Sequence, residues 1–349
     1  MAPIKPSDLL CPRPEGLYCP PGDFYIDPVR PVARAVITHG HSDHARSGHG
    51  AVVATPQTLD IMAVRYGEGY AAAVQPLPYG ETAKRDGVEI SLAPAGHILG
   101  SAQVVVRWKG MTIVVSGDYK RSPDPTCAPF EPVPCDVFVT EATFGLPVFR
   151  FPPPQEAAQA LLHSLTQFPE RAHMVGVYAL GKAQRLTALL RQAGYDQPIY
   201  VHGALERLNA LYEQWDVRLG TLLPATGANA DALKQRSDSA NKMFGGQIIL
   251  APPSAIEDRW SRRFPDPINA FASGWMRVRA RARQRHVELP LILSDHADWE
   301  ELTSTIAELR PQELWITHGR EEALGRWAEL NGVASRPLDI VGYEDEEEA

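Results

Sequence analysis

The sequence predicts an α/β protein built from sheets whose strands are buried on both faces. Short apolar, β-branched runs recur along the chain, such as residues 35–37 and 112–115, and continuous apolar runs of this length are typical of strands covered on both sides. Several of these runs end in a histidine or a carboxylate. In the middle of the chain, helical and strand patterns alternate, which is typical of a separate, smaller α/β unit.

Length and composition are those of an ordinary globular protein. The 349 residues allow about two domains or one elaborated domain, and 44% apolar and 22% charged residues are average values. The chain has no apolar run of about 18 residues and no basic-then-apolar start, so we expect a cytoplasmic protein with no membrane contact. The four cysteines form no C-x-x-C pair, and we expect reduced thiols.

The net charge of −8 does not exclude a polyanionic partner, because the acidic residues are unevenly distributed. Five of the negative charges lie in the terminal run 344–348. We expect residues 344–349 to be a solvated tail; a regulatory or partner-binding tail is the alternative.

Five apolar runs are followed closely by an imidazole or a carboxylate. The side chains delivered in this way are His39, Asp118, Glu141, His296 and His318. Sites in layered α/β proteins are assembled at the C-terminal ends of strands and in the loops that follow. These five strand ends can therefore converge on one cleft.

The densest group of candidate metal ligands is His39-Gly-His41-Ser-Asp43-His44. Alternate side chains of an extended segment face the same way, so His39 and His41 can reach one ion. Asp43 and His44 follow where the chain turns, into a helix expected to start near Asp43, and can point at a second ion. Imidazole and carboxylate suit divalent Zn, Mn or Fe. A polar loop with coincidental histidines is the alternative, and three of the chain's 11 histidines within residues 39–44 disfavour it.

A further histidine, His97, lies between Gly96 and Gly100. Glycines on both sides let the backbone approach its neighbours closely, as a ligand loop requires. The apolar run 104–108 comes next, and Lys109-Gly110 then leads into another strand, which predicts a β-hairpin.

The middle of the chain is expected to be an inserted unit. Its proline-rich start at residues 151–154 marks a boundary, and the following patterns predict helices at 155–167, 182–192 and 204–214 and strands at 174–178 and 199–202. Site-bearing strands resume near Leu291. The predicted organisation is therefore residues 1–150 and 289–343 as two parts of one domain, residues 151–288 as the insertion, and residues 344–349 as the tail.

An arginine occupies every second position near the end of this unit: Arg277, Arg279, Arg281, Arg283 and Arg285. In a strand, all five guanidinium groups would line one face and suit a phosphodiester backbone; an edge strand protected by charge is the alternative. Lys182, before a predicted helix, can approach a phosphate. Trp275 either stacks on a base or packs in the core.

The ordered motifs resemble a known family. The motif His39-x-His41-x-Asp43-His44, then His97, Asp118 and His318, is similar to that of the metallo-β-lactamase fold, which implies an αββα sandwich. Glu141, His296 and the inserted unit add a resemblance to the β-CASP branch, nucleases that include RNase J, the polyadenylation endonuclease and Artemis-like enzymes. The likeness to bacterial DNA-ligase-associated exonucleases lies in residues 16–19, 25–28, 180–185, 273–277 and 294–298.

The resemblance implies a role for each motif residue. One metal ion would be held by His39, His41 and His97, and a second by Asp43, His44 and His318. Asp118 would bridge the two ions. Asp27, at the end of an early strand, would orient a ligand histidine, a role that commonly affects metal affinity.

The implied chemistry is phosphodiester hydrolysis with two divalent ions, Zn or Mn. Ions about 3.5–4 Å apart can activate water and stabilise both oxygens of an in-line displacement. His296 would protonate the leaving oxygen, with Glu141 holding its ring, while Asp43 and Asp118 complete the catalytic group. Asp298 either contacts a ligand or substrate or starts the following helix.

We therefore expect a metal-dependent DNA nuclease, an exonuclease acting on single-stranded DNA from the 5′ end in repair, with a DNA ligase or other repair proteins as partners. His318 is the residue found in RNA-cutting members, whereas eukaryotic DNA-cutting members usually have valine, so an RNA-processing nuclease of the RNase J type is the alternative. A small-molecule hydrolase needs neither the insertion nor the arginines. An inactive scaffold is disfavoured because every ligand position is filled.

Overall fold

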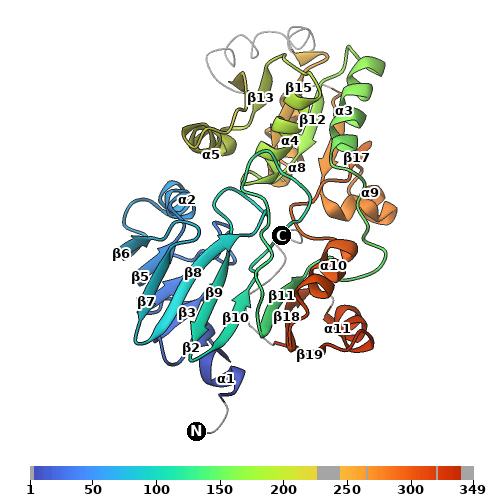
Figure 1. Ribbon diagram of the computed structural model, residues 1–349. Helices are drawn as coiled ribbons and strands as arrows, with labels where there is room; N and C mark the ends of the chain where they lie inside the picture. The colour runs from blue at the N-terminus through green and yellow to red at the C-terminus, as the bar shows by residue number, and fades with distance from the viewer. Residues whose placement is uncertain (1–3, 226–243, 265, 320, 339–349) are drawn as a thin grey trace. The chain divides into compact units, whose positions relative to one another are not determined.

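The computed structural model describes residues 4–225, 244–264, 266–319 and 321–338, which form two compact units (Figure 1). The first unit comprises Met1–Arg150 and His296–Ala349, and the second comprises Phe151–Asp295. The chain re-enters the first unit at His296, later than the expected residue 289. The reason is that strand β17 (Leu289–Leu291) pairs with β16 (Ile268–Ala272) in the second unit's own sheet.

Two sheets form the centre of the first unit. One sheet has the order β1-β2-β3-β4-β5-β6, with strands Cys11–Arg13, Gly16–Cys19, Phe24–Ile26, Arg34–Val36, His49–Ala54 and Ala71–Pro76. The other has the order β19-β18-β11-β10-β9-β8-β7. In chain order its strands β7 to β11, β18 and β19 are Thr82–Arg85, Val88–Pro94, Ala102–Trp108, Met111–Val115, Val137–Ala142, Glu313–Gly319 and Ala334–Pro337.

The alternation of side chains along β9 shows how the layers pack. Val104 and Val106 belong to the core between the two sheets, which also contains Val36 of the opposite sheet. Val105 points to the other face of the sheet, where it packs in one cluster with residues of the helices that cover that face. Strands with apolar residues on both faces are buried on both sides, as the continuous apolar runs predicted.

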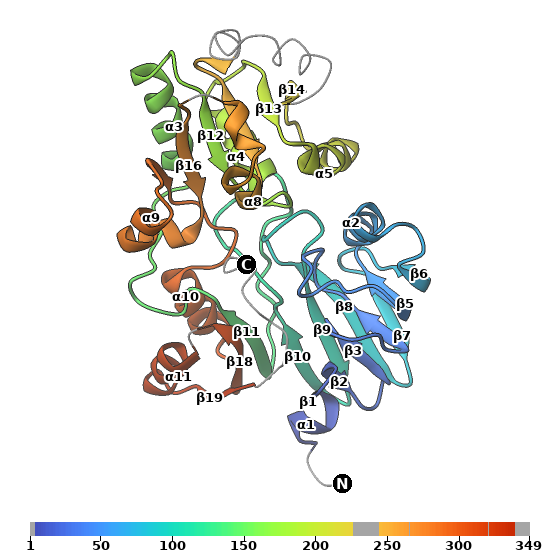
Figure 2. The same cartoon turned by 180° about the vertical axis from the view of Figure 1, so that it is seen from behind.

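Helices cover the outer face of each sheet. Helix α2 (Pro56–Tyr66) packs Leu59 and Met62 on the six-stranded sheet. Helices α10 (Trp299–Leu309) and α11 (Glu321–Leu330) cover the seven-stranded sheet (Figures 1 and 2). The first turn of the chain, α1 (Pro6–Leu9), adds Leu9 to the central core. The predicted αββα sandwich is confirmed.

One local prediction is confirmed and one is wrong. Strands β9 and β10 form the predicted hairpin, in which Lys109 and Gly110 have φ of 48° and 87°, as a two-residue turn of matching twist requires. No helix starts near Asp43: within this described stretch, His44 and Ala45 donate to His41 O at 3.2 and 2.7 Å and the turn ends there. Strand β5 begins at His49, which leaves no room for a helix.

The second unit contains a parallel sheet of order β14-β13-β15-β12-β16-β17. Strands β12 to β15 are His173–Gly176, Ile199–Val201, Leu222–Pro224 and Ile248–Ala251. Helices α3 (Gln155–Gln167), α4 (Lys182–Gln192) and α5 (Gly203–Gln214) lie where the sequence predicted helices. The apolar residues of α3 and α4 pack with Val175 and Leu250 in one core, and Met174 and Ile249 belong to another on the opposite face.

The arginine-rich segment is helical rather than extended, so both interpretations of it as a strand are wrong. Short elements precede it, α8 (Pro253–Glu257), η1 (Ser261–Arg263) and η2 (Gly274–Arg277), and the segment itself is α9 (Arg279–Gln284). Ala282 is the buried residue of α9 and packs with Phe271 and Met276. On a helix, residues two apart do not face the same side, so the arginines do not form a single row.

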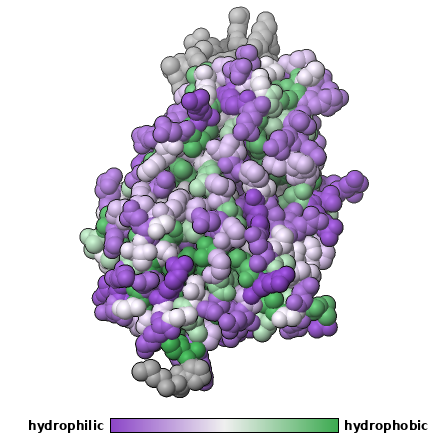
Figure 3. All heavy atoms as spheres, in the orientation of Figure 1, coloured by the Kyte–Doolittle hydropathy of each residue, from purple (hydrophilic) through white to green (hydrophobic). Residues whose placement is uncertain are grey.

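No helix within the described residues is long and apolar enough to span a bilayer. On the face of the molecule in Figure 3, hydrophilic and hydrophobic residues are interspersed. The four cysteines, all of them within the described residues, form no disulfide with one another. The acidic tail, residues 344–349, lies outside the described part of the chain.

Candidate metal centre

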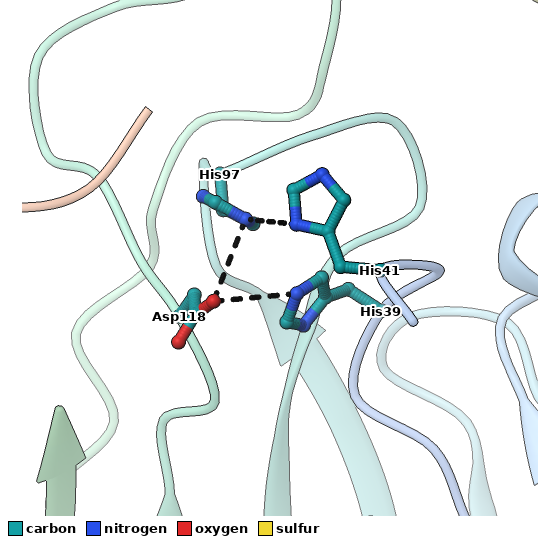
Figure 4. A group of neighbouring side chains, drawn as sticks. All are labelled: His39, His41, His97 and Asp118. Carbon is teal, nitrogen blue, oxygen red and sulfur yellow. Dashed lines mark hydrogen bonds and ion pairs between the residues drawn. The ribbon is translucent and has the colours of Figure 1, made fainter. Parts of the chain in front are cut away.

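Loops after three strands of the first unit bring together His39, His41, His97 and Asp118 (Figure 4). The two first histidines follow β4, His97 lies between β8 and β9, and Asp118 follows β10. Gly96 and Gly100 on either side of His97 have φ of 75° and 77°, which glycine adopts without strain. All four side chains are buried.

The spacing of these four side chains fits a single ion. His39 Nε2 and His97 Nε2 lie 3.4 and 3.7 Å from Asp118 Oδ2, and His97 Nε2 lies 3.0 Å from His41 Nδ1. Four ligand atoms held about 2.1 Å from a tetrahedral ion are about 3.4 Å apart. Three imidazoles and one carboxylate also form a donor set that suits Zn or Mn.

A second group shares Asp118. Its members are Asp43, His44 and Asp118, and His44 Nε2 lies 3.4 Å from Asp43 Oδ2 and 3.5 Å from Asp118 Oδ2. The turn after His41 places Asp43 and His44 on this side of the shared carboxylate. Two groups of side chains, each with the spacing of metal ligands, therefore share one aspartate.

His318, the remaining expected ligand, belongs to β18 (Glu313–Gly319), which pairs with β11. Its side chain lies outside the described part of the structure. Its role as a ligand stays a prediction.

Asp27 supports His44 from the side opposite the cluster. Its Oδ2 lies 2.8 Å from His44 Nδ1 and accepts a hydrogen bond of 2.6 Å from the Thr38 hydroxyl, while Oδ1 accepts one of 2.8 Å from Thr38 N. Asp27 directly follows β3, as expected, and has a φ of 44°. Buried at 1% exposure, the carboxylate fixes the ring orientation so that Nε2 faces Asp118.

The electrostatic surroundings of His39, in the first group, differ from those of His44, in the second. Burial, reinforced by the neighbouring His44, holds the pKa of His39 well below its ordinary value, so its ring is neutral and able to donate a lone pair. Burial also opposes the charged form of His44, but Asp118, Asp43 and Asp27 outweigh it and hold the pKa of His44 well above its ordinary value. A positive charge is thus favoured on the ring of His44, which has Asp27 at Nδ1 and Asp43 and Asp118 at Nε2.

His296 lies beside the cluster and contacts Glu141. Its Nδ1 lies 2.9 Å from Glu141 Oε2 and 3.9 Å from Asp118 Oδ2, and its side chain is 14% exposed. Glu141 Oε1 accepts a hydrogen bond of 2.8 Å from Tyr119 N. With its carboxylate fixed at both oxygens, Glu141 orients the ring of His296. Asp118, Glu141 and His296 also have ligand spacing, so the site allows either an acid or a ligand role for His296.

Asp298 acts as the N-cap of α10. Its Oδ1 accepts a hydrogen bond of 3.0 Å from Glu301 N, and Glu301 Oε2 accepts one of 3.2 Å from Asp298 N. This reciprocal pair is a capping box. Of the two expectations for Asp298, the helix start is therefore the one that the contacts support.

The expected nucleic-acid contacts lie in the second unit. Lys182 begins α4 after Gly181, and its Nζ lies 3.9 Å from Asp295 Oδ2. Arg277, Arg279 and Arg283 are exposed. Arg281 instead covers Trp275, with its guanidinium carbon 3.8 Å from the ring centroid, and Trp275 is buried at 6% exposure, as its core interpretation predicted.

Three supporting residues were not predicted from the sequence: Thr38, Lys120 and Glu301. Thr38 holds Asp27, and Lys120 Nζ forms a buried ion pair of 2.7 Å with Glu301 Oε2. The D-x-x-E pattern of Asp298 and Glu301 carries a capping signal, but nothing local to Lys120 indicates its partner 181 residues away.

No model of a known protein family matches the sequence. Among curated proteins, a "Probable DNA ligase" of Opitutus terrae is 28% identical over 333 residues, which are 90% of this chain and 30% of that protein. An "Endoribonuclease ysh1" of Aspergillus fumigatus is 27% identical, covering 54% of this chain and 25% of its own. A "Cleavage and polyadenylation specificity factor subunit 3" of Dictyostelium discoideum is 23% identical, covering 72% and 38%.

This chain thus spans well under half the length of these curated relatives. A solved structure, titled a protein of unknown function from Enterococcus faecalis V583, has a TM-score of 0.56 and 14% identity, covering 88% of this chain and 80% of that one. At this identity it shows the fold alone.

The two-sheet sandwich with a histidine and aspartate cluster at its strand ends defines the metallo-β-lactamase fold class. Within that class, the recognition of the chain as a relative of the β-CASP nucleases is confirmed by the matches to the ysh1 and specificity-factor proteins. The Opitutus protein adds the DNA-ligase-associated link.

Proposed function

We propose that this protein is a metal-dependent nuclease that hydrolyses DNA phosphodiester bonds, acting as an exonuclease on single-stranded DNA in repair. The proposal rests on one observation: two groups of side chains with the spacing of metal ligands both contact Asp118 Oδ2. Two adjacent divalent ions can stabilise both the attacking and the leaving oxygen of a phosphodiester. A single shared carboxylate is the arrangement that such a pair needs.

The proposed ligands follow the two groups. His39, His41 and His97 would hold one ion and Asp43, His44 and His318 the other, with Asp118 shared between them. When bound, Zn or Mn ions would supply Lewis-acid stabilisation of the phosphodiester oxygens. Asp27 and Thr38 would keep His44 aligned through the contacts described above.

His296 is the proposed general acid. Its Nδ1 is occupied by Glu141, so the other ring nitrogen can carry a proton toward a leaving oxygen. The Glu141 carboxylate holds the plane of the ring through this contact. Because the side chain is partly exposed, a substrate phosphate can approach it.

Arginines and a lysine of the second unit are the proposed backbone contacts. Arg277, Arg279 and Arg283 offer exposed cations, which attract a phosphodiester chain irrespective of its sequence. Lys182 at the start of α4 and Arg281 complete the proposed set. Arg281 is held on Trp275 and would contribute less.

DNA is favoured as the substrate by the Opitutus relative. The match covers 90% of this chain and 30% of that protein, which is named as a probable DNA ligase. A nuclease that matches part of a protein named as a DNA ligase would suit the trimming of DNA ends before they are joined. We propose that this chain also works with a DNA ligase or other repair proteins.

RNA cleavage is the second candidate, because several relatives are named endoribonucleases. A separation of the two candidates needs both substrates in one experiment. Single-stranded DNA and RNA, each labelled at the 5′ or the 3′ end, would be incubated with Mn, Zn or Mg and either wild-type protein or Asp118→Ala.

We expect wild type to shorten DNA from the 5′ end and Asp118→Ala to lose on the order of 10³-fold in rate, since several kcal/mol of charge stabilisation disappear. Asp86→Ala, at an exposed turn, is the matched control and should cleave normally. Cleavage of RNA alone would overturn the DNA assignment. Equal inactivity of wild type and Asp118→Ala on every substrate would overturn the nuclease proposal.

A further inference from the structure

A buried ion pair joins the segment that follows Asp118 to helix α10. Lys120 is 4% exposed, and its Nζ lies 2.7 Å from Glu301 Oε2 in the first turn of α10. Glu301 Oε1 accepts a further hydrogen bond of 2.7 Å from Ser122 N. Removing one partner of such a pair leaves an uncompensated buried charge, so both partners are needed together.

Backbone hydrogen bonds of Tyr119 and Lys120 connect this segment to the parts of the chain that carry other site residues. Tyr119 N donates to Glu141 Oε1 at 2.8 Å, and Tyr119 O accepts from Ala297 N at 2.6 Å. Lys120 N donates to Ala95 O at 3.0 Å. The segment that follows Asp118 is therefore attached to the loop of His97 on one side and to the residue after His296 on the other.

The packing of these loops is tight at one glycine. Gly96, which precedes His97, has a φ of 75° and lies so close to Lys120 O that any Cβ at this position would overlap it. A displacement of the Lys120 backbone therefore displaces the His97 loop. The Lys120 side chain is the part of this segment that reaches α10, the helix whose N-cap is two residues beyond His296.

We propose that Lys120 and Glu301 are positioning residues: their ion pair joins the Asp118 segment to the start of α10 and so sets His296 relative to Asp118 and His97. This inference rests on the proposed function for its effect on catalysis, and on geometry alone for its effect on the metal centre. Neither residue touches the reacting atoms. Partners that orient ligands in this way typically change metal affinity or activity about 10–100-fold when replaced.

Lys120→Met and the double variant Lys120→Met/Glu301→Gln test the proposal. Glutamine keeps a carbonyl oxygen for the cap, and the double variant leaves no unpaired charge, so it should fold when the single variant does not. The control is Lys84→Met/Glu89→Gln, which removes an exposed ion pair of 2.8 Å on the β7–β8 hairpin of the same unit. Urea unfolding establishes that each protein is folded.

The first readout is cobalt, used as a spectroscopic probe ion. We expect the double variant to bind Co(II) at least about tenfold more weakly than wild type, with altered visible absorption bands. In a cleavage assay, kcat should fall about tenfold while KM stays within about twofold, because substrate contacts are untouched. The Lys84 control should match wild type in every measurement.

A folded double variant with wild-type Co(II) affinity, spectrum and kcat would overturn the proposal. Equal losses in the control pair would also overturn it, since they would show a general effect of charge removal. If wild type cleaves no nucleic acid, the nuclease proposal fails while the cobalt titration still decides the role of the ion pair.

Discussion

The histidine and aspartate cluster of the first unit and the arginine-rich segment of the second differ in how their side chains are held. The cluster is buried and built from loops far apart in the sequence, with carboxylates such as Asp27 fixing the rings. The arginines come from one short stretch, and three of the proposed contacts, Arg277, Arg279 and Arg283, are exposed. Fixed geometry suits metal and proton chemistry, whereas mobile cations suffice for a uniform phosphate backbone.

Among the variants that test the fixed geometry of the cluster, His296→Ala should have the largest effect. We expect it to retain its metal yet lose cleavage about 10²- to 10⁴-fold, the range for a missing general acid. Metal content by mass spectrometry and single-turnover cleavage measure the two effects separately. Loss of an ion instead would make His296 a ligand rather than an acid.

A smaller effect is expected for Asp27→Asn. Asparagine tolerates the positive φ of this position and keeps an acceptor for Thr38, but it removes the charge facing His44 Nδ1. Metal affinity should fall about 10–100-fold, measured by competition with a chelating dye. Asp23→Asn, at an exposed and likewise positive φ position, is the control; an unchanged affinity for Asp27→Asn would refute its orienting role.

Effects in the arginine-rich segment should be smaller still. Arg279→Ala and Arg283→Ala should each weaken single-stranded DNA binding and reduce the slope of log K against log salt by about 0.7. Arg281→Ala should change the slope less and lower the free energy of unfolding, because its guanidinium packs on Trp275. Fluorescence anisotropy at several salt concentrations measures the slopes. Equal slopes in wild type and both exposed-site variants would remove these arginines from the interface.

The smallest effect concerns pH. Burial raises the pKa of Glu301, but Lys120 and the N–H groups of Asp298 and Ser122 outweigh it and lower the pKa below its ordinary value of 4.5. A carboxyl group whose pKa is lower in the folded than in the unfolded state stabilises the fold at pH values above its unfolded-state pKa. This contribution is lost as the pH falls through its folded-state pKa.

The stability of wild type relative to Lys120→Met/Glu301→Gln should therefore be constant above about pH 5 and decline as the pH falls below about 4.5. Urea unfolding at a series of pH values measures it. A difference that grows as pH falls would contradict the direction of the shift.

The α/β class and the main cluster could be predicted from local signals, whereas the αββα sandwich was expected from the family resemblance. Apolar runs gave the strands, and His39, His41 and Asp118 follow strand ends that the topology brings to one place. The turn at Asp43 was mistaken for a helix start because the early return of the chain into β5 has no strong signal.

Other features depend on contacts that no local pattern encodes. An arginine at every second position fits a strand by period, yet packing of Ala282 against Phe271 and Met276 selects a helix. Strand β17 belongs to the second unit because it pairs with β16. The composition of the strand does not indicate this partner. The Lys120–Glu301 pair connects distant parts of the chain in the same way.

We propose that the buried cluster holds two divalent ions through one shared aspartate, Asp118. Equilibrium dialysis against Zn or Mn, followed by mass-spectrometric metal counting, tests it without reference to any substrate. We expect two ions per wild-type chain and at most one per Asp118→Ala chain, with Asp86→Ala unchanged. Two ions in Asp118→Ala, or none in wild type, would contradict it.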